Sequence, residues 1–478
     1  MVKDKLDISE TLESAKKLLQ EEKHISPALK AIIKILITLV TLLAGKISLN
    51  SRNSGRPPSS DPNRKKNNKS KNTNRKPGGQ LGRVGVNLHP VENPDKIIDL
   101  TIDKRTLPHG EYTNMGFEAR QMVDIVISCV VTEYRAQILE DMHGSRYIAT
   151  FPEGIIRPIQ YGQSVKSHAV YMSQFQLIPY ERVADYFANE MKLPLSVGSL
   201  FNFNKEAYER LEVFDALAKE KLSHATLMHV DETGINLNGK RKWLHSASNR
   251  LWTYFYPHDK RGKEAMDEIG ILPNFQGKLV HDHWKPYFTF NVEHVLCNAH
   301  HIRELQWVID NHPTYTWAQS MQELLFSANK QVTASQAQKL DKNSEKIVRK
   351  KYCSILELGL QEMPSPEISD NKKGRMKKSK SLNLLERLKN FEKETLRFTV
   401  DTDVPFTNNQ GENDLRMTKV QQKISGCFKS IEGAKIFCRV RSYLLTTQKH
   451  GLSPTEALKI LFQGKLPDVL FTGPPIEA

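Results

Sequence analysis

Cysteine is scarce in this sequence and is not arranged in the pairs that stabilise small secreted or zinc-binding modules. Five cysteines stand among 478 residues, and no two of them have the Cys-x-x-Cys spacing. A disulfide framework and a four-cysteine zinc module are therefore excluded as explanations of the fold. The expected environment is a reducing compartment.

Long apolar runs are also missing. The most apolar stretch is free of charge only over Ile35–Gly45, between Lys34 and Lys46, whereas a membrane-spanning helix needs about 20 apolar residues. The first residues, Met1–Asp7, lack the basic-then-apolar order of a signal peptide. We therefore expect a cytoplasmic protein that has no membrane partner.

Negative charge is in deficit. Asp and Glu number 54 against 69 Lys and Arg, which leaves a formal net charge of +15 at pH 7. Such an excess favours a polyanionic partner, of which nucleic acid is the most common. The hydrophobic fraction of 39% and the charged fraction of 26% are ordinary for globular proteins, so most of the chain should fold. The length predicts roughly two to four domains.

The first 85 residues combine a helical segment with a basic arm. Apolar residues recur at helical spacing over 1–50, with a break expected at Pro27, and this segment could seed a coiled-coil homo-oligomer or dock on the rest of the chain. Residues 51–85 cannot build a core and are expected to contact DNA phosphates, although a solvated linker would have the same composition. The basic residues of this arm that we expect to bind DNA are Arg64, Lys65, Lys66, Arg75 and Lys76.

The next two segments lead to the chemistry-bearing half of the chain. Over 86–150 apolar and polar residues alternate, notably within Gln121–Tyr134, which predicts a small β-rich module. Residues 151–222 are predicted to be helical. Within them Glu181–Glu190 and Ser196–Tyr208 resemble a helix-turn-helix whose second helix has a serine N-cap. An ordinary pair of helices would give the same pattern.

The segment 223–430 predicts an α/β core with a mixed sheet. Strand patterns around a turn at Asn238-Gly239 indicate three consecutive antiparallel strands, and two more strands follow a crossover helix. The five expected strands cover Thr226–Asn236, Lys242–Ser248, Leu251–Tyr256, Lys278–Asp282 and Glu293–Asn298. An inserted helical region is expected over about 305–400, and C-terminal helices over 431–478.

Three acids have contexts that differ from those of ordinary surface carboxylates. Asp231 and Asp282 each end an apolar strand, and Glu412 lies in the first turn of an expected helix. Carboxylates gathered at one edge of a sheet would repel one another unless divalent cations neutralised them, and oxygen ligands favour Mg or Mn. Two such ions per site would permit phosphoryl-transfer chemistry.

Each acid also has an ordinary structural interpretation. Asp231 begins a turn-like sequence, Asp231-Glu-Thr-Gly. Asp282 could orient a neighbouring histidine or cap the next helix. Glu412 stands three residues after Asn409, which is the spacing of a capping box. Only the combination of the three acids favours catalysis.

Histidines and a cysteine near the second acid permit a competing zinc site. They are His281, His283, Cys297, His300 and His301. Nitrogen and sulfur ligands suit tetrahedral zinc, but the strict spacing of zinc motifs is absent. The two histidines that flank Asp282 share one face of a strand and could instead contact DNA. Zinc is therefore not the expected metal.

A basic stripe follows the third acid. If the segment after Pro405 is one helix, Glu412, Arg416, Lys419 and Lys423 fall at i, i+4, i+7 and i+11, on a single face. This arrangement favours contact with DNA phosphates beside the metal site. A solvated face with one Glu–Arg pair is the alternative.

Four long motifs occur in one order along the chemistry-bearing half. They are His229-Val-Asp231-Glu-Thr-Gly, Val280-His-Asp282-His-Trp-Lys-Pro-Tyr, Leu296-Cys-Asn-Ala-His-His-Ile-Arg-Glu-Leu305 and Pro405-Phe-Thr-Asn-Asn-Gln-Gly-Glu412-Asn-Asp-Leu-Arg-Met-Thr-Lys. Together they resemble the transposases (TnpC type) of the bacterial insertion sequence sixty-six family, in the DDE superfamily. Shorter motifs that begin at Lys423 and Arg439 extend the resemblance over nearly the whole chain.

The resemblance implies an RNase H-like core with a metal-binding triad, here Asp231, Asp282 and Glu412. It implies binding to double-stranded DNA, namely the element's terminal inverted repeats and target DNA, with strand cutting and joining in the bacterial nucleoid. Companion proteins of the same element are typical of the family. The motif residues that we expect to support the acids are His281, His283, Asn298 and His300.

Two features depart from the family pattern. Family members commonly carry a Cys-x-x-Cys zinc module after the basic arm, and no such cysteines stand near Thr106–Gly110. The module over 86–150 is therefore expected to be degenerate. Alanine usually precedes the catalytic glutamate, where this chain has Gly411; glycine costs ~1 kcal/mol of helix propensity in a helix interior and less near an end.

A DDE-type DNA transposase is the leading hypothesis from the sequence. The alternatives are a non-catalytic DNA-binding regulator or inactive relic, which would use only the basic segments, and a zinc hydrolase built on the His/Cys cluster.

Overall fold

The computed structural model describes residues 8–21, 25–47, 49–50, 52–54, 61, 88–363 and 378–472. The chain divides into a larger unit, residues 1–64 and 134–478, and a smaller unit, residues 65–133. The basic-arm residues that we expect to bind DNA lie outside the described residues. They are Arg64, Lys65, Lys66, Arg75 and Lys76.

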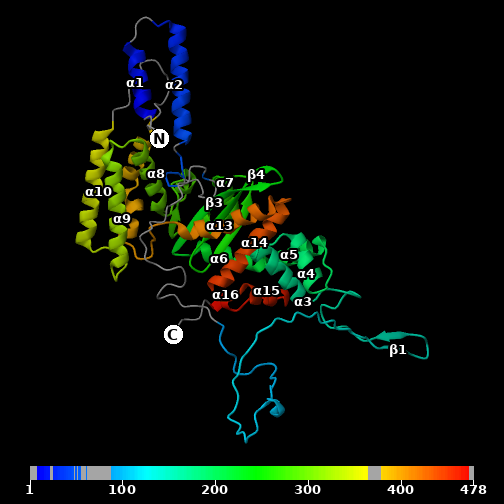
Figure 1. Ribbon diagram of the computed structural model, residues 1–478. Coiled ribbons are helices and arrows are strands. Elements are labelled where there is room, and N and C mark those ends of the chain that lie inside the picture. Colours follow the sequence, from blue (N-terminus) through cyan, green and yellow to red (C-terminus); the bar gives the residue numbers. More distant parts are fainter. Residues whose placement is uncertain are drawn as a thin grey trace. The chain divides into compact units, whose positions relative to one another are not determined.

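Two helices form the described N-terminal segment, α1 (Ile8–Glu21) and α2 (Pro27–Ile47) (Figure 1). The predicted break is confirmed, because Pro27 is the first residue of α2, where its missing N–H is tolerated. Apolar side chains of α2 are exposed, among them Ile32, Leu36 and Leu39. No helix in the described part of the chain is long and apolar enough to cross a bilayer.

Residues 88–150 differ from the expected β-rich module. Their regular strands are limited to the hairpin β1 (Ile138–Glu140) and β2 (Arg146–Ile148), and η2 (Lys104–Thr106) is a single helical turn. Gln121–Tyr134 forms no strand, and most of its apolar side chains are exposed. Alternation is insufficient here because a strand is stable only when a partner strand takes its backbone hydrogen bonds and a second layer covers its apolar face.

The helical segment before the sheet matches its prediction. It contains α3 (Gln163–Val170), the π-helical turn η3 (Tyr171–Phe175), α4 (Tyr180–Glu190), α5 (Val197–Arg210) and α6 (Glu212–Ser223). The expected N-cap is present, since the Ser196 hydroxyl accepts a hydrogen bond from the Ser199 N–H. That the pair α4–α5 reads DNA stays a prediction.

A five-stranded mixed sheet forms the centre of the larger unit. Its strands are β3 (Leu227–Leu237), β4 (Lys240–Ser248), β5 (Thr253–His258), β6 (Lys278–His281) and β7 (Glu293–Leu296). The order is β5-β4-β3-β6-β7; β3, β4 and β5 pair antiparallel, and β6 pairs parallel with both β3 and β7. The predicted α/β class and all five strands are confirmed, and the core is consistent with an RNase H-like fold.

Helices cover both faces of the sheet. On one face α13 (Asn409–Ser425) and α14 (Ile431–Lys449) lie across β3–β5 (Figure 1), and Leu415 and Phe437 pack with Ile235 of β3. The other face is closed by α7 (Lys263–Ile269), η4 (Leu272–Asn274) and η5 (Lys285–Thr289). The chain then continues through α15 (Pro454–Phe462), which begins with a capping box formed by Ser453 and Glu456, and α16 (Val469–Thr472).

An inserted helical region separates the sheet from α13, as predicted. It consists of α8 (Asn298–Asn311), α9 (Thr316–Ala334), α10 (Lys342–Glu362), α11 (Lys380–Asn390), α12 (Glu392–Leu396) and η6 (Arg397–Thr399). Its core is built around Trp317, Tyr352 and Leu385, and it joins the sheet through Val280 of β6 and Val295 of β7. The insertion therefore packs on the edge of the sheet that carries β6 and β7.

Gly359 of α10 has no room for a side chain. A Cβ there would lie 2.5 Å from Leu385 Cδ1 and 3.0 Å from Trp317 Cγ, and both neighbours are fully buried. We predict that Gly359→Ala lowers the free energy of unfolding by about 1–3 kcal/mol, the usual cost of overpacking. Urea denaturation followed by circular dichroism measures this change.

Gly198→Ala in the first turn of α5 is the matched control. The nearest atom to its Cβ would be Ser196 Oγ at 3.7 Å, so alanine should leave stability unchanged or raise it by up to about 1 kcal/mol. If Gly359→Ala and Gly198→Ala had equal free energies of unfolding, the close packing of α10 against Trp317 and Leu385 would be contradicted.

Candidate active site

The parallel pairing of β3 with β6 sets the first two acids side by side. Leu227–His229 pair with Lys278–Val280 at a constant offset of 51 residues. The same offset, continued along the chain, brings Asp231 beside Asp282. Because side chains alternate along a strand, Asp231 points to the same face as His229, which is the face that α13 covers.

The third acid is positioned by Asn408, the residue before α13. Its side-chain Oδ1 accepts a hydrogen bond from His229 Nδ1 at 2.7 Å, and its Nδ2 donates to the Val230 carbonyl at 2.9 Å. These contacts fix the start of α13 against β3, and Glu412 follows one turn later. The capping box considered from the sequence is not formed, because Asn409 is the first residue inside the helix and no side chain caps α13.

The environment of Asp231 disfavours its charge. Burial raises the pKa of this carboxyl well above its usual value, and the charges of Glu232, Asp282 and Glu412 raise it further. One backbone N–H, that of Glu232, donates to Asp231 Oδ1 at 2.8 Å and opposes the shift. Asp231 therefore experiences the charges of both other candidate acids, although they are remote in sequence.

Asp282 has a related but better compensated environment. Burial raises the pKa of Asp282, and the Trp284 N–H, which donates to its Oδ1 at 3.0 Å, opposes this rise. The charges of Arg261 and Arg387 also oppose it. Arg387 comes from α11, so the inserted helices contribute a cation to this acid, and no pattern in the sequence predicts that approach.

Glu232 is a buried carboxylate that sequence reasoning missed. It points to the face opposite Asp231, where Arg261 Nε and Nη2 both donate to its Oε1, at 2.8 and 2.6 Å. The Tyr287 hydroxyl donates to its other oxygen. The guanidinium of Arg261 also lies 4.0 Å from the ring centroid of Trp284. This cluster ties the middle of β3 to the segment that follows β6.

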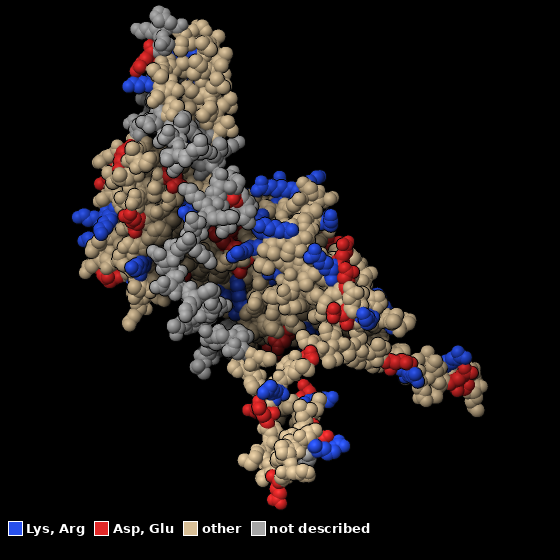
Figure 2. All heavy atoms as spheres, in the orientation of Figure 1, with Lys and Arg blue, Asp and Glu red and all other residues tan. Residues whose placement is uncertain are grey.

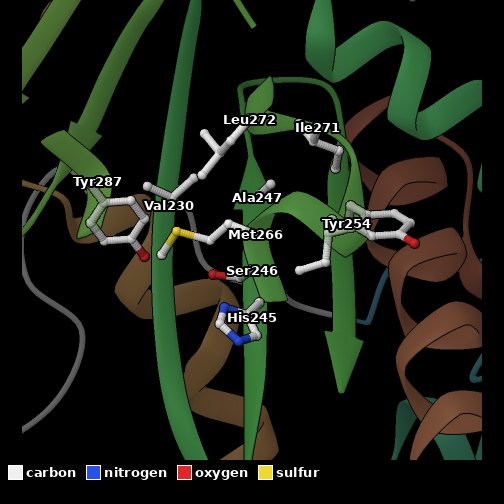
Figure 3. Close-up of a pocket in the computed structure, with 10 residues that line it drawn as sticks. Val230, His245, Ser246, Ala247, Tyr254, Met266, Ile271, Leu272 and Tyr287 are labelled. Atoms are coloured by element: carbon white, nitrogen blue, oxygen red, sulfur yellow. The ribbon is translucent and has the colours of Figure 1, made fainter. Parts of the chain in front are cut away.

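A small cavity lies on the same face as Glu232 (Figure 3). It encloses about 20 Å³, which is room for about one water molecule. Its lining is mostly apolar and includes Val230, with His245 and Tyr287 among its few polar residues. Because Asp231 points to the other face of β3, this cavity does not join the acids.

The two histidines that flank Asp282 are engaged in packing. His281 is buried, its Nε2 lies 3.0 Å from His294 Nδ1, and burial lowers its pKa to about 3. The ring of His283 packs against those of Phe288 and Phe391, at centroid distances of 5.0 and 4.5 Å. Burial lowers the pKa of His283 to about 4. Burial therefore favours the neutral form of both rings, and that they support the acids stays a prediction.

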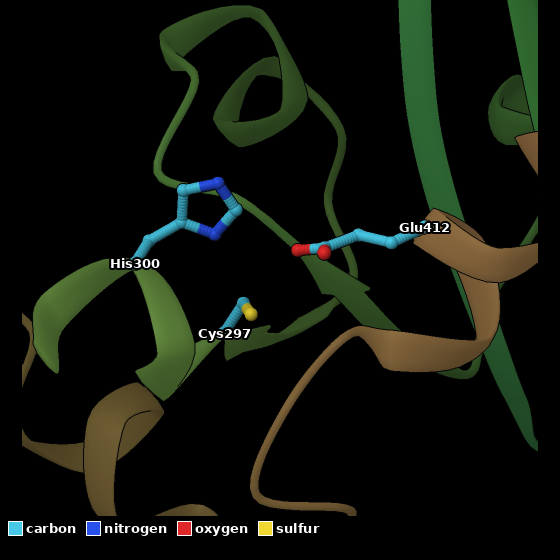
Figure 4. Close-up of side chains that lie close together, drawn as sticks. All are labelled: Cys297, His300 and Glu412. Atoms are coloured by element: carbon cyan, nitrogen blue, oxygen red, sulfur yellow. The ribbon is translucent and has the colours of Figure 1, made fainter. Parts of the chain in front are cut away.

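The other two expected supporting residues begin α8. Asn298 Nδ2 donates to the Thr395 carbonyl of α12 at 3.0 Å, and its Oδ1 lies 3.1 Å from His301 Nδ1. Asn298 therefore ties the start of α8 to α12, two helices of the inserted region. His300 lies beside Glu412 and Cys297, and these three side chains converge (Figure 4).

The basic stripe lies on one continuous helix, α13, as predicted. Lys419 Nζ donates to the Gly234 carbonyl of β3 at 2.6 Å; burial and Arg241 lower its pKa, and the charge of Asp231 raises it. Arg416 and Lys423 are exposed. Figure 2 shows Lys and Arg side chains gathering where the β3–β4 hairpin adjoins α13. Of this basic stripe, Lys419 lies close enough to Asp231 for their charges to interact.

Residues 158–436 match the family described as Transposase IS66 family, and this span holds the whole sheet, the three acids and α13. The chain belongs to this family. The IS66 family is one of DDE-type transposases, which generally use divalent metal ions. Residues 5–89 match a second family, of unknown function (DUF6444). No curated protein matches the chain.

Removing the charge of Asp231 should stabilise this IS66-family chain when no divalent cation is bound. The pKa of Asp231 is higher in the folded state than its unfolded value of about 3.9. As the pH falls, the folded state therefore binds the proton before the unfolded state does. At neutral pH, where Asp231 is charged in the unfolded state, its charge lowers the free energy of unfolding. Asp231→Asn should therefore raise the Tm at pH 7, and its advantage over the wild type should narrow as the pH falls. Differential scanning calorimetry measures both.

The exposed acid Asp403, which lies before α13, provides the control. Asp403→Asn should leave the Tm unchanged. A Tm for Asp231→Asn below that of the wild type at pH 7 would contradict the electrostatic account.

Proposed function

We propose that this chain is a DNA transposase that binds the ends of an insertion sequence and cuts and joins DNA strands. Asp231, Asp282 and Glu412 are its proposed catalytic acids. The observation that carries the proposal is that Asp231 of β3 lies close enough to Asp282, at the end of β6, and to Glu412, in the first turns of α13, for both charges to raise its pKa. The membership in a transposase family supports it.

The three acids suit divalent cations. Their donors are carboxylate oxygens, which Mg and Mn prefer. The raised pKa of Asp231 reflects burial together with the charges of Glu232, Asp282 and Glu412, and a cation would relieve that repulsion. Two magnesium ions, when bound, supply activation of the attacking oxygen and stabilisation of the leaving oxygen of a phosphodiester.

The protein's own residues position the acids and the DNA. Asn408 holds the start of α13 on β3, and Arg261 with Glu232 anchors β3 from the opposite face. Arg416 and Lys423 extend from the exposed face of α13, where they would neutralise phosphates next to the acids. Because Arg416 and Lys423 follow Glu412 along α13, a DNA strand that contacts both would run from the acids along this helix.

The proposed partners are double-stranded DNA at the terminal inverted repeats and at the target. The basic arm, residues 51–85, and the pair α4–α5 are proposed as further DNA contacts. The exposed apolar residues of α2 support a homo-oligomer. We also propose that companion proteins of the same element act with this chain, and the only support for them is that they are typical of the family.

Loss of any one catalytic acid should abolish strand transfer while leaving end binding intact. We predict that Asp231→Asn, Asp282→Asn and Glu412→Gln each reduce transfer about 1,000-fold or more, which corresponds to several kcal/mol of lost transition-state stabilisation. Gel assays with labelled element ends and Mg measure transfer, and fluorescence anisotropy without Mg measures binding. Asp403→Asn should retain both.

Two outcomes would contradict this account. Transfer at the wild-type rate by any one of the three variants would remove that residue from the triad. End binding by the wild type, without nicking under either Mg or Mn, would favour the non-catalytic DNA-binding regulator.

The exposed basic residues of α13 should contribute to DNA affinity through phosphates. Arg416→Ala and Lys423→Ala should each weaken binding to all sequences alike and lower the slope of log affinity against log salt by about 1. Lys465→Ala, which removes an exposed cation beyond α15, is the control and should leave the slope unchanged. An unchanged slope in both α13 variants would place the DNA elsewhere.

A further inference from the structure

Glu412 belongs to a second group of potential ligands besides the acids. One atom each of Cys297, His300 and Glu412 lies within 4.8 Å of the other two. Figure 4 shows the three side chains converging from the start of α8 and the first turns of α13. The group therefore offers one sulfur, one nitrogen and one oxygen to the same small space.

Backbone contacts hold this group together. Cys297 is the N-cap residue of α8 and His300 is its third residue, so one helical turn places both side chains at the same end. Cys297 Sγ accepts a hydrogen bond from the Asn408 N–H at 3.1 Å. Asn408 in turn precedes Glu412 by one turn of α13. The distance between the two helix starts is thus set by Asn408.

One ring nitrogen of His300 is buried and unsatisfied. Its Nδ1 makes no hydrogen bond with any residue in the described ranges. A buried polar atom that lacks a partner is costly. Figure 4 shows the imidazole turned toward the Glu412 carboxylate and the Cys297 sulfur, so an ion among the three would give this nitrogen a partner.

We propose that Cys297, His300 and Glu412 bind zinc, or a divalent transition ion of similar softness, at a site that shares only Glu412 with the proposed magnesium site. Three protein ligands of these types with a fourth position for water are a common zinc set. Ligand bonds of 2.0–2.3 Å in a tetrahedron separate the donor atoms by about 3.3–3.8 Å, so the three side chains need to close by about 1 Å. Magnesium does not compete here, because it prefers oxygen ligands alone.

The shared ligand makes the zinc site a regulator of the proposed transposase, and this part rests on the proposed function. A Glu412 carboxylate held on zinc by Cys297 and His300 is withdrawn from Asp231 and Asp282. Zinc therefore lowers strand transfer, and added magnesium does not restore it while zinc stays bound.

Cobalt titration of the metal-free full-length protein tests the binding site without reference to activity. The wild type should develop the sulfur-to-cobalt charge-transfer band of a thiolate ligand at one equivalent, and zinc should displace it. Cys297→Ser should lose the band. Cys353→Ser, which changes an exposed cysteine outside the group, and Asp231→Asn should keep it. Absence of the band from the wild type, or its persistence in Cys297→Ser, would overturn the proposal.

A second variant guards against misfolding of Cys297→Ser. His300→Asn keeps the thiolate and should retain the band with at least about 10-fold weaker cobalt affinity, a loss of about 1.4 kcal/mol. Unchanged cobalt affinity in His300→Asn would also overturn the site.

Strand transfer in the presence of zinc tests the regulation. Zinc should inhibit the wild type, and Cys297→Ser, compared with its own rate without zinc, should need at least about 10-fold more zinc for the same inhibition. A cobalt band without zinc inhibition would overturn the regulatory role. Failure of the proposed function is distinguishable, because the wild type would then show no transfer even without zinc.

Discussion

The parallel register between β3 and β6 is the constraint on which the candidate site depends. Its constant offset brings Asp231 level with Asp282 and puts both on the face that α13 crosses. A shift of β3 by one residue would turn all of its side chains to the opposite face of the sheet. Glu232, which now pairs with Arg261 on the other face, would then take the place of Asp231 at the site. The buried contacts of Asn408 then add the third acid by fixing the start of α13 against the same strand.

A concentration of negative charge is the second feature of this site. The folded chain holds Asp231 where burial and three neighbouring carboxylates all disfavour its ionisation, while cations such as Arg261 and Arg387 compensate Asp282. Such an arrangement opposes folding and is typical of sites that bind a cation. The same packing places Glu412 close to the Cys297 sulfur and a His300 nitrogen at the start of α8. Glu412 is therefore a shared ligand of the proposed magnesium site and the proposed zinc site.

Much of this architecture follows from sequence patterns, and the exceptions have physical reasons. The five strands were predictable because apolar runs and a turn at Asn238-Gly239 delimit them. The strand-end and helix-start contexts singled out the three acids, and the resemblance implied that they form a triad. The pairing of Glu232 with Arg261 and the approach of Arg387 to Asp282 depend on tertiary packing, which leaves no periodic signal. The sequence revealed the Cys297–His300 spacing but not the third ligand, which α13 brings from far along the chain. The alternation of apolar and polar residues within Gln121–Tyr134 predicted strands, but this segment forms no strand in the structure.

Asp231, Asp282 and Glu412 are proposed to share bound divalent cations, and iron-dependent hydroxyl-radical cleavage detects such shared binding. Fe²⁺ substituted for magnesium, in the presence of hydrogen peroxide and ascorbate, reduces the peroxide to hydroxyl radicals that cut the backbone next to the ligands of the iron. The account predicts cuts near all three acids, suppressed by excess magnesium and lost in Asp231→Asn. Cleavage near Glu412 alone, or cleavage near the acids that magnesium fails to suppress, would contradict it.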